Sequence, residues 1–142
     1  MASPPKRGPF GPLSALREVA CVLSSLAMPI QIVSAPITRD ELRRMAGGQF
    51  GDFVKAVVDV QSGVMVVGGD LHADEETLLL EQGARQADLW GINLYPDKTG
   101  TEFIEFDSMI NVRPSQGNRS RGVEDAAVQR LIRDIVGRRV SR

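Results

Sequence analysis

The sequence has few of the side chains that cross-link a chain or bind metals most strongly. Its 142 residues include a single cysteine, Cys21, and a single histidine, His72. One cysteine excludes an internal disulfide framework and a zinc site made of several cysteines. Cysteine use this sparse fits a reducing compartment, so we expect a cytoplasmic protein.

Long hydrophobic runs and a strong net charge are also missing. No stretch approaches the roughly 18 consecutive apolar residues that a membrane-spanning helix needs, so we expect no membrane partner. The formal net charge of −1 counts against a general nucleic-acid binder, which presents a positive surface to phosphates. A content of 42% hydrophobic and 25% charged residues is typical of one ordinary globular domain with a single core.

The first 28 residues differ in composition from the rest of the chain, because they carry several prolines and a short apolar run. A secretory signal needs an uninterrupted hydrophobic core, whereas Arg17 and Glu18 interrupt this one. We therefore predict that residues 1–28 are a flexible or mis-started extension and that Met28 is the natural start. Residues 29–142 are then expected to form a single domain.

Periodic patterns predict the elements of the first half of that domain. Residues 30–33 read as a short strand. A helix follows, because Thr38 and Glu41 have the spacing of a capping box. The apolar, β-branched runs 53–60 and 64–67 are separated by a turn and predict a hairpin of central, covered strands.

The second half shows the same two periodicities. Residues 73–82 predict a helix that ends at Gly83, and residues 89–94 and 102–110 predict a second hairpin. Residues 123–136 predict the last helix. The apolar residues expected to share a face are Trp90, Ile92 and Leu94 on one strand, Ile104, Phe106 and Ile110 on the next, and Val123, Ala127, Val128, Leu131, Ile132, Ile135 and Val136 on the helix.

These elements together predict the fold class. We expect an α+β protein, a single compact domain in which a mixed or mainly antiparallel sheet with two hairpins packs against about three helices.

Four segments of this region resemble a known family. They are VKAVVDVQSGVMVVGGDLHADEE, QADLWGINLYP, IEFDSMINVRPSQGNRS and the following VED, and they resemble small uncharacterised bacterial proteins that are known only as a domain of unknown function. The resemblance covers the chain from Pro29 to Val136 and leaves out the N-terminal extension. It implies no activity and no site residues, so function has to be argued from the residues themselves.

The segment from Asp70 to Glu76 combines the only histidine with several carboxylates. Asp70, His72 and Asp74 alternate along the chain, and in an irregular loop they could converge on a divalent cation such as Mg²⁺, Mn²⁺ or Zn²⁺. Two alternatives that need no metal remain open. The helix dipole stabilises acidic residues in a first turn without any ligand, and a lone histidine is commonly a hydrogen-bonded structural residue.

The loop of residues 111–121 is the better candidate for binding an anion. It supplies three guanidinium groups with hydroxyl and amide donors and leads into the last predicted helix, and both arginine forks and helix N-terminal amides bind phosphates and carboxylates. The alternative is structural: the arginines pair with acidic residues, a serine caps the helix, and residues 117–118 form a turn. The candidate ligand-binding residues are Arg113, Asn118, Arg119, Ser120 and Arg121.

Two polar residues of the predicted second hairpin, Asn93 and Ser108, are further candidates for a site. Trp90 and Tyr95 are explained by packing, whereas Asn93 lies on the opposite face from Trp90 and is less easily explained that way. Ser108 follows Asp107, but neighbouring strand residues point to opposite sides and the only histidine is distant in sequence. The pattern therefore does not predict a serine-hydrolase triad.

The two signs of charge are separated along the chain. Residues 68–107 contain ten acidic and two basic side chains, whereas residues 113–142 contain eight arginines and three acidic side chains. We expect these segments to pack against each other, or against a second copy of the chain in a homodimer. The alternative is a site with one acidic wall and one basic wall.

Three hypotheses about function follow, and only the third gives a residue a catalytic role. The first is a binding or regulatory module that recognises a small anionic ligand or an acidic protein partner through the 111–121 loop. The second is a metal-dependent phosphoester hydrolase, in which Asp70, His72 and Asp74 hold a divalent cation, the one cofactor indicated. The third is a small ribonuclease or toxin-like protein that would bind RNA phosphate through the arginines and use His72 as acid/base. The low net charge counts against this hypothesis.

Overall fold

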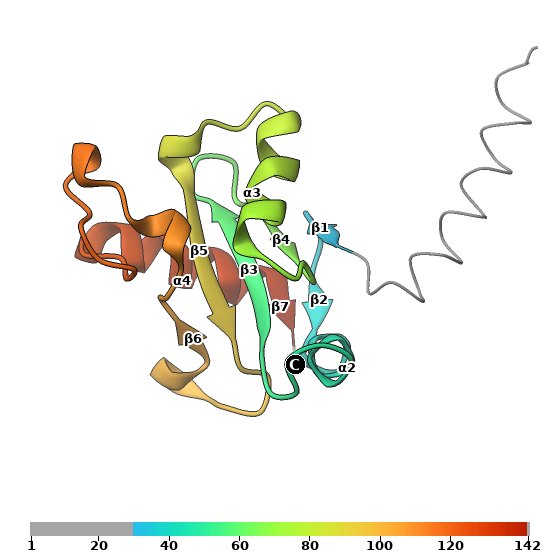
Figure 1. Ribbon diagram of the computed structural model, residues 1–142. Coiled ribbons are helices and arrows are strands. Elements are labelled where there is room, and N and C mark those ends of the chain that lie inside the picture. Colours follow the sequence, from blue (N-terminus) through green and yellow to red (C-terminus); the bar gives the residue numbers. More distant parts are fainter. Residues whose placement is uncertain (1–29, 142) are drawn as a thin grey trace, which may run out of the picture.

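The computed structural model describes residues 30–141 (Figure 1). Its main sheet has five strands in the order β1-β4-β3-β5-β6, and each neighbouring pair is antiparallel. The β3–β4 and β5–β6 pairs are the two predicted hairpins, so the α+β fold class with a mainly antiparallel sheet is confirmed. The strands are β1 (Gln31–Val33), β3 (Val54–Asp59), β4 (Val64–Val67), β5 (Leu89–Leu94) and β6 (Ile104–Glu105).

Three α-helices within residues 30–141 pack on the sheet, with α3 on one face and α4 on the other (Figure 1). They are α2 (Arg39–Gly47), α3 (His72–Glu81) and α4 (Ala126–Arg139). A second, parallel pair of short strands links the start of α2 to the end of α4. These strands are β2 (Ile37–Thr38) and β7 (Val140–Ser141).

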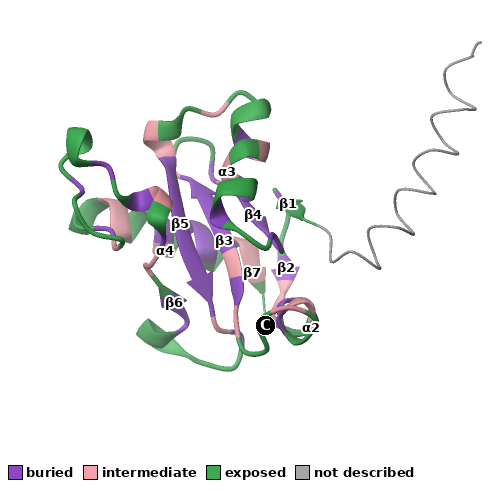
Figure 2. Ribbon diagram, in the orientation of Figure 1, coloured by how far each residue is buried: buried purple, intermediate pink, exposed green. Residues whose placement is uncertain are grey.

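Alternation along the central strand β3 sends its side chains into two hydrophobic clusters. Val54, Ala56 and Val58 belong to the larger cluster, which also contains buried residues of α2 and α4, whereas Val57 belongs to a smaller cluster beneath α3. Most of β3 and all of β5 are buried (Figure 2). The buried members of the smaller cluster are only Val57, Val66, Leu79 and Leu89, so part of the α3 face of the sheet is left to polar side chains.

Two predicted helix boundaries are present in atomic detail. Thr38 Oγ1 accepts a hydrogen bond from the Glu41 amide at 3.1 Å, and the Glu41 carboxylate accepts one from the Thr38 amide at 3.3 Å. This is the predicted capping box at the start of α2. Beyond the end of α3, Gly83 has a φ of +97°, the left-handed conformation with which many helices terminate.

The second hairpin is shorter than the sequence predicted. Its alternation predicts one strand over residues 102–110, but β6 ends at Glu105 and the chain then forms the 3₁₀ helix η3 (Met109–Asn111). This turn breaks the alternation, so Ile110 packs with the smaller cluster while Phe106 packs against the larger one. The prediction of a single shared face for these two residues was wrong.

The last helix also differs from its prediction. Asp125 is the N-cap, so α4 starts at Ala126 and not at residue 123. Leu131, which the spacing placed in the buried stripe, is 47% exposed because it lies about a quarter turn from the stripe's centre. Ala127 is exposed as well. The residues of α4 that are buried are Ile132, Ile135 and Val136.

The predicted N-terminal extension, residues 1–28, lies outside the described residues, and Cys21 and Met28 lie outside them too. The extension and the start at Met28 therefore stay predictions. Within residues 30–141, no helix is long and apolar enough to cross a membrane.

The capping box yields a test of the fold. Replacing Thr38 by alanine should lower the free energy of unfolding by about 1 kcal/mol, because the Glu41 amide at the start of α2 loses its acceptor. Thr77→Ala is the matched control, since the Thr77 hydroxyl only donates to the carbonyl of Ala73 within α3. Urea unfolding measures both, and equal losses in the two variants would show that the box contributes nothing of its own.

Candidate functional site

A row of three polar side chains crosses the sheet on the α3 face. Lys55 on β3 pairs in register with Asn93 on β5, and Asn93 pairs with Glu105 on β6. Residues opposite each other in an antiparallel sheet point to the same face, and Lys55 shares its face with Val57 of the smaller cluster because the two are separated by one residue. We call Lys55, Asn93 and Glu105 the polar row.

Asn93 is the buried centre of the polar row. Its side chain is 6% exposed, and its Nδ2 donates to Glu105 Oε1 at 2.8 Å. The Tyr95 hydroxyl donates to the same carboxylate oxygen at 3.0 Å, and burial together with the Glu105 charge raises the pKa of Tyr95 to about 12. Within residues 30–141, Asn93 Oδ1 is buried and has no hydrogen-bond partner. The row thus presents one unused acceptor.

Lys55 supplies an uncompensated positive charge beside that acceptor. Its ammonium group lies 5.1 Å from the centre of the Phe50 ring, a distance at which a cation is attracted to the aromatic face. No salt bridge joins Lys55 to any residue between 30 and 141. Its charge is therefore free to interact with an anion.

His72, the first residue of α3, is held over the neighbouring part of β5. The ring is 7% exposed, and Nε2 lies 2.7 Å from the carbonyl oxygen of Ile92. A carbonyl can only accept, so Nε2 carries the proton and Nδ1 keeps the lone pair in the neutral ring. Burial lowers the pKa of His72 most, and the charges of Lys55 and Arg121 lower it further, against the raising effects of the Ile92 bond and Asp107.

The side chains of Ser108 and His72 both lie close to the backbone of Gly91. A Cβ at position 91 would lie 2.5 Å from Ser108 Cβ and 3.2 Å from His72 Cδ2, so only glycine fits there. Ser108 Oγ accepts from the Ile110 amide at 3.2 Å. Among the described side chains, no hydrogen bond joins Ser108 to His72, which leaves the serine-hydrolase triad without support.

Asn111 attaches the 107–121 segment to the sheet. Its amide side chain accepts from the Gly91 amide at 2.8 Å and donates to the Gly91 carbonyl at 2.9 Å, so it makes both hydrogen bonds that a neighbouring strand would make. The same Nδ2 donates to the carbonyl of Arg121 at 2.9 Å. Asn111 is completely buried. A side chain thus continues the ladder beyond the end of β6 and ties the Arg121 end of the segment to it.

Two of the predicted ligand-binding residues hold this segment in place. Arg113 is 7% exposed, donates to the carbonyls of Gln86 and Leu89, and stacks 4.1 Å from the centre of the Trp90 ring. Asn118 is 4% exposed, and its Nδ2 donates to three backbone carbonyls, those of Asn111, Ser120 and Gly122. Their polar groups face the protein, although Arg113 bonds to backbone carbonyls and not to the acidic residues that the structural alternative predicted.

The backbone amides of Arg119 and Ser120 bind an anionic group of the protein itself, the carboxylate of Glu124. Each donates to Oε2 of Glu124 at 2.8 Å, and these bonds lower the pKa of Glu124, the Ser120 amide most. The predicted cap of α4 by Ser120 is wrong, because its hydroxyl accepts from the amide of Gly122 instead. The Arg119 side chain is exposed.

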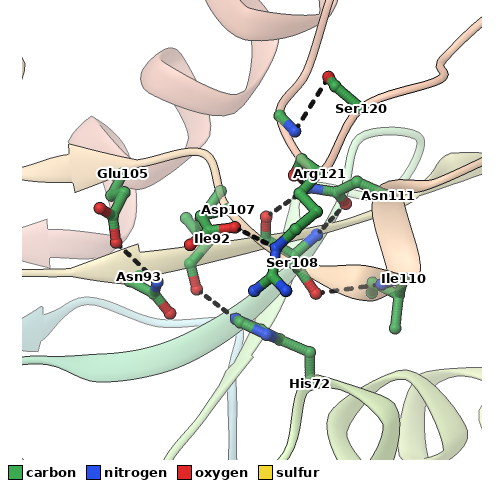
Figure 3. A network of polar contacts seen from close by, with 12 residues as sticks. His72, Ile92, Asn93, Glu105, Asp107, Ser108, Ile110, Asn111, Ser120 and Arg121 are labelled. Atoms are coloured by element: carbon green, nitrogen blue, oxygen red, sulfur yellow. Dashed lines mark hydrogen bonds and ion pairs between the residues drawn. The ribbon is translucent and has the colours of Figure 1, made fainter.

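Arg121 is the predicted site residue that reaches the polar row's neighbourhood. Its Nε donates to Asp107 Oδ1 at 2.6 Å, and both side chains remain partly exposed. Figure 3 shows this pair above His72 and Ser108, with Asn93 and Glu105 alongside. The acidic and basic segments of the sequence do meet at this ion pair. We call the polar row together with His72, Asp107, Ser108 and Arg121 the polar cluster.

The predicted metal ligands are not gathered at one point. Asp70 is exposed and accepts from Gln49 Nε2 at 3.1 Å, His72 turns toward Ile92, and Asp74 is exposed in the first turn of α3. Across residues 30–141, no group of three or more histidine, cysteine, aspartate or glutamate side chains is placed to hold a metal ion. The divalent cation stays a prediction without support from this geometry.

Glu75 is one of the carboxylates that the sequence placed in the first turn of α3, and the structure buries it. Its side chain is completely buried, Oε2 accepts from the Gly69 amide at 2.9 Å, and Oε1 has no partner among the described residues. A Cβ at position 69 would lie 2.7 Å from Glu75 Cγ, so the glycine permits this contact. Burial raises the pKa of Glu75 well above its ordinary value.

Sequence reasoning missed two members of the polar row, although each left a signal. Lys55 is a charged residue between apolar residues of its strand, and Glu105 precedes the break in the second hairpin. Neither could be assigned to a site before the register placed both beside Asn93.

The fold and the polar cluster define a small α+β protein with a polar patch on one face of an antiparallel sheet. The chain belongs to the family described as "Protein of unknown function (DUF5674)", which matches residues 31–139. This match confirms the resemblance to a domain of unknown function. Comparison with curated proteins and with solved structures gives no match.

The close approach at Gly91 can be tested by a double-mutant cycle. Gly91→Ala should lower the free energy of unfolding by about 1–3 kcal/mol through overpacking, and Ser108→Gly in the same chain should recover part of that loss because the clashing atoms are gone. Gly47→Ala, where an added Cβ meets no atom within 4 Å, should not destabilise. Additive losses at positions 91 and 108, measured by urea unfolding, would contradict the proposed contact.

Glu75 should make stability fall as pH rises. Its pKa in the folded protein lies above the unfolded value near 4.5, so its contribution is fully present below pH 4.5 and is lost as pH rises toward the folded pKa. Glu75→Gln removes the titration. As pH rises across that range, the parent should therefore lose unfolding free energy relative to Glu75→Gln. A difference between the two proteins that does not change with pH would contradict a raised pKa.

Proposed function

We propose that the protein is a binding module for a small ligand that carries an anionic group and a hydrogen-bond donor, and that the polar cluster is its site. The proposal rests on Asn93 Oδ1, a buried acceptor without a partner among the described residues. An unpaired buried amide oxygen costs about 1–3 kcal/mol. A ligand that donates a hydrogen bond to Asn93 would remove this cost.

Charge supports the anionic part of the ligand. Lys55 lies next to Asn93 in register and has no acidic partner within residues 30–141. Arg121 is 55% exposed at its side chain and offers the guanidinium edge that its Nε bond to Asp107 does not use. Two cations beside one free acceptor therefore suit a carboxylate or phosphate that also carries an N–H or O–H group.

The neighbouring groups support binding more than catalysis. Glu105 already accepts two hydrogen bonds, from Asn93 and Tyr95, and the His72 proton is donated to a backbone carbonyl. These contacts fix the walls of the site, which lowers the entropy cost of binding. Arg113 and Asn118 contribute by holding the segment that carries Arg121.

A thermal-shift screen of amino acids, small carboxylates and sugar phosphates tests the proposal on the full chain. A compound that raises the melting temperature should bind roughly tenfold to a hundredfold more weakly to Lys55→Met and to Asn93→Leu, because each removes one charged or buried hydrogen-bond partner while keeping similar bulk. Titration calorimetry measures the affinities.

Arg119→Ala is the matched control, since it removes the same charge as Arg121→Ala from the same segment. The proposal expects Arg121→Ala to weaken binding and Arg119→Ala to leave it unchanged. Binding that is lost in Arg119→Ala and retained in Lys55→Met would instead place the anion at the 111–121 loop predicted from the sequence. A panel without any stabilising compound would contradict the proposed function.

A further inference from the structure

A second candidate site lies on the opposite face of β6. Ile104 points away from the polar row, because its neighbour Glu105 belongs to that row, and it lines a cavity of about 360 Å³. Three segments that are distant in sequence meet there: the start of α2, the chain from η2 (Gly100–Glu102) to β6, and the second half of α4 with β7. The cavity is separate from the polar cluster.

The lining of this cavity combines an apolar floor with positive charge only. Phe103, Ile104, Val136 and Val140 supply apolar surface, and Arg39 and Arg133 are the charged residues among those that line it. Among the described residues, none of those that line the cavity carries a carboxylate. A cationic ligand would be repelled here, and a small anion without an apolar part would leave the floor unused.

Arg39 is held in one orientation by the protein. Its guanidinium stacks 4.0 Å from the centre of the Phe103 ring, and one terminal nitrogen donates to the carbonyls of Pro96 and Lys98, each at 3.0 Å. The second terminal nitrogen makes no hydrogen bond to the described residues. A guanidinium fixed in this way loses little side-chain entropy when it binds a further anion.

Arg133 supplies the second charge from α4. Its guanidinium lies 4.9 Å from the centre of the Phe106 ring, and it takes part in no salt bridge with any residue of the 30–141 range. Two guanidinium groups with donors to spare thus flank one apolar cavity, the arrangement that recognises an anionic head on a short apolar body.

We propose that this cavity binds a small amphipathic carboxylate, with Arg39 and Arg133 on the carboxylate and the chain or ring of the ligand against Phe103, Val136 and Val140. This site is independent of the polar cluster and of the ligand proposed for it. Each part of the inference follows from the lining: the sign of the charges selects an anion, and the apolar floor selects a ligand with a hydrophobic body.

Hexanoate is the probe, and amide chemical shifts of the full chain report where it binds. Titration with hexanoate should shift the amide signals of Gly100, Thr101 and Gly137, which line the cavity. Hexylammonium, which has the same body and the opposite charge, and acetate, which lacks the body, should not shift them.

Two variants and two controls complete the test. Arg133→Met should weaken hexanoate binding roughly tenfold, the effect of losing one charge-assisted hydrogen bond, whereas Arg130→Met removes an exposed arginine of the same helix and should change nothing. Gly137→Leu fills the cavity from α4, where an added Cβ meets no atom within 4 Å, and should abolish binding in a folded protein. Gly47→Leu on α2 is its control.

Weaker hexanoate binding in Arg133→Met and loss of the shifts in Gly137→Leu, with both controls binding as the parent does, support the site. Equal shifts with hexylammonium, full binding by Arg133→Met, or no shift at millimolar hexanoate would each overturn it. Shifts at Lys55 and Asn93 in place of the cavity residues would also overturn it, and would assign the carboxylate to the polar cluster.

Discussion

The amide side chain of Asn111 is the contact on which the site depends, because it takes the place of a strand. It makes both backbone hydrogen bonds at Gly91 after β6 has ended, and it holds the carbonyl of Arg121 with its remaining donor. Ser108 and Arg121 are therefore brought to the same part of β5, although they lie 13 positions apart in the chain. A buried amide that satisfies all three of these groups is rigid as well as stabilising.

The other polar residues of the 107–121 segment extend this arrangement. The Asn118 side chain donates hydrogen bonds to three backbone carbonyls, and the Arg113 guanidinium donates to two more. The backbone amides of Arg119 and Ser120 both donate to the Glu124 carboxylate. Polar side chains hold this segment together as a hydrophobic core does elsewhere, since each offsets the desolvation of a backbone group with a hydrogen bond. The segment therefore has no regular secondary structure over most of its length and is still held rigidly, so the position of Arg121 is fixed.

Sequence alone predicted the elements that local rules determine. The capping box at Thr38, the glycine at position 83 and the β3–β4 hairpin each depend on residues within a few positions of one another. Sequence reasoning failed where a side chain makes the hydrogen bonds of a strand's backbone. No local rule indicates that Asn111 pairs with Gly91, so residues 102–110 were predicted as one continuous strand. The same limit applied to the site. Asn93 stood out, but Lys55 and Glu105 joined it only through strand register, and the inward-facing roles of Arg113 and Asn118 depend on carbonyls that the sequence does not mark.

The brevity of β6 has a consequence for the behaviour of the protein in a crowded solution. A sheet edge with a long row of free amides and carbonyls is a template on which another chain can add a strand. Here one edge is β6, with two residues, and the other is β1, with three. Past the end of β6, the amide and carbonyl of Gly91 are already bonded to the Asn111 side chain. The same asparagine that shapes the polar cluster thus also protects the sheet against edge-to-edge self-association.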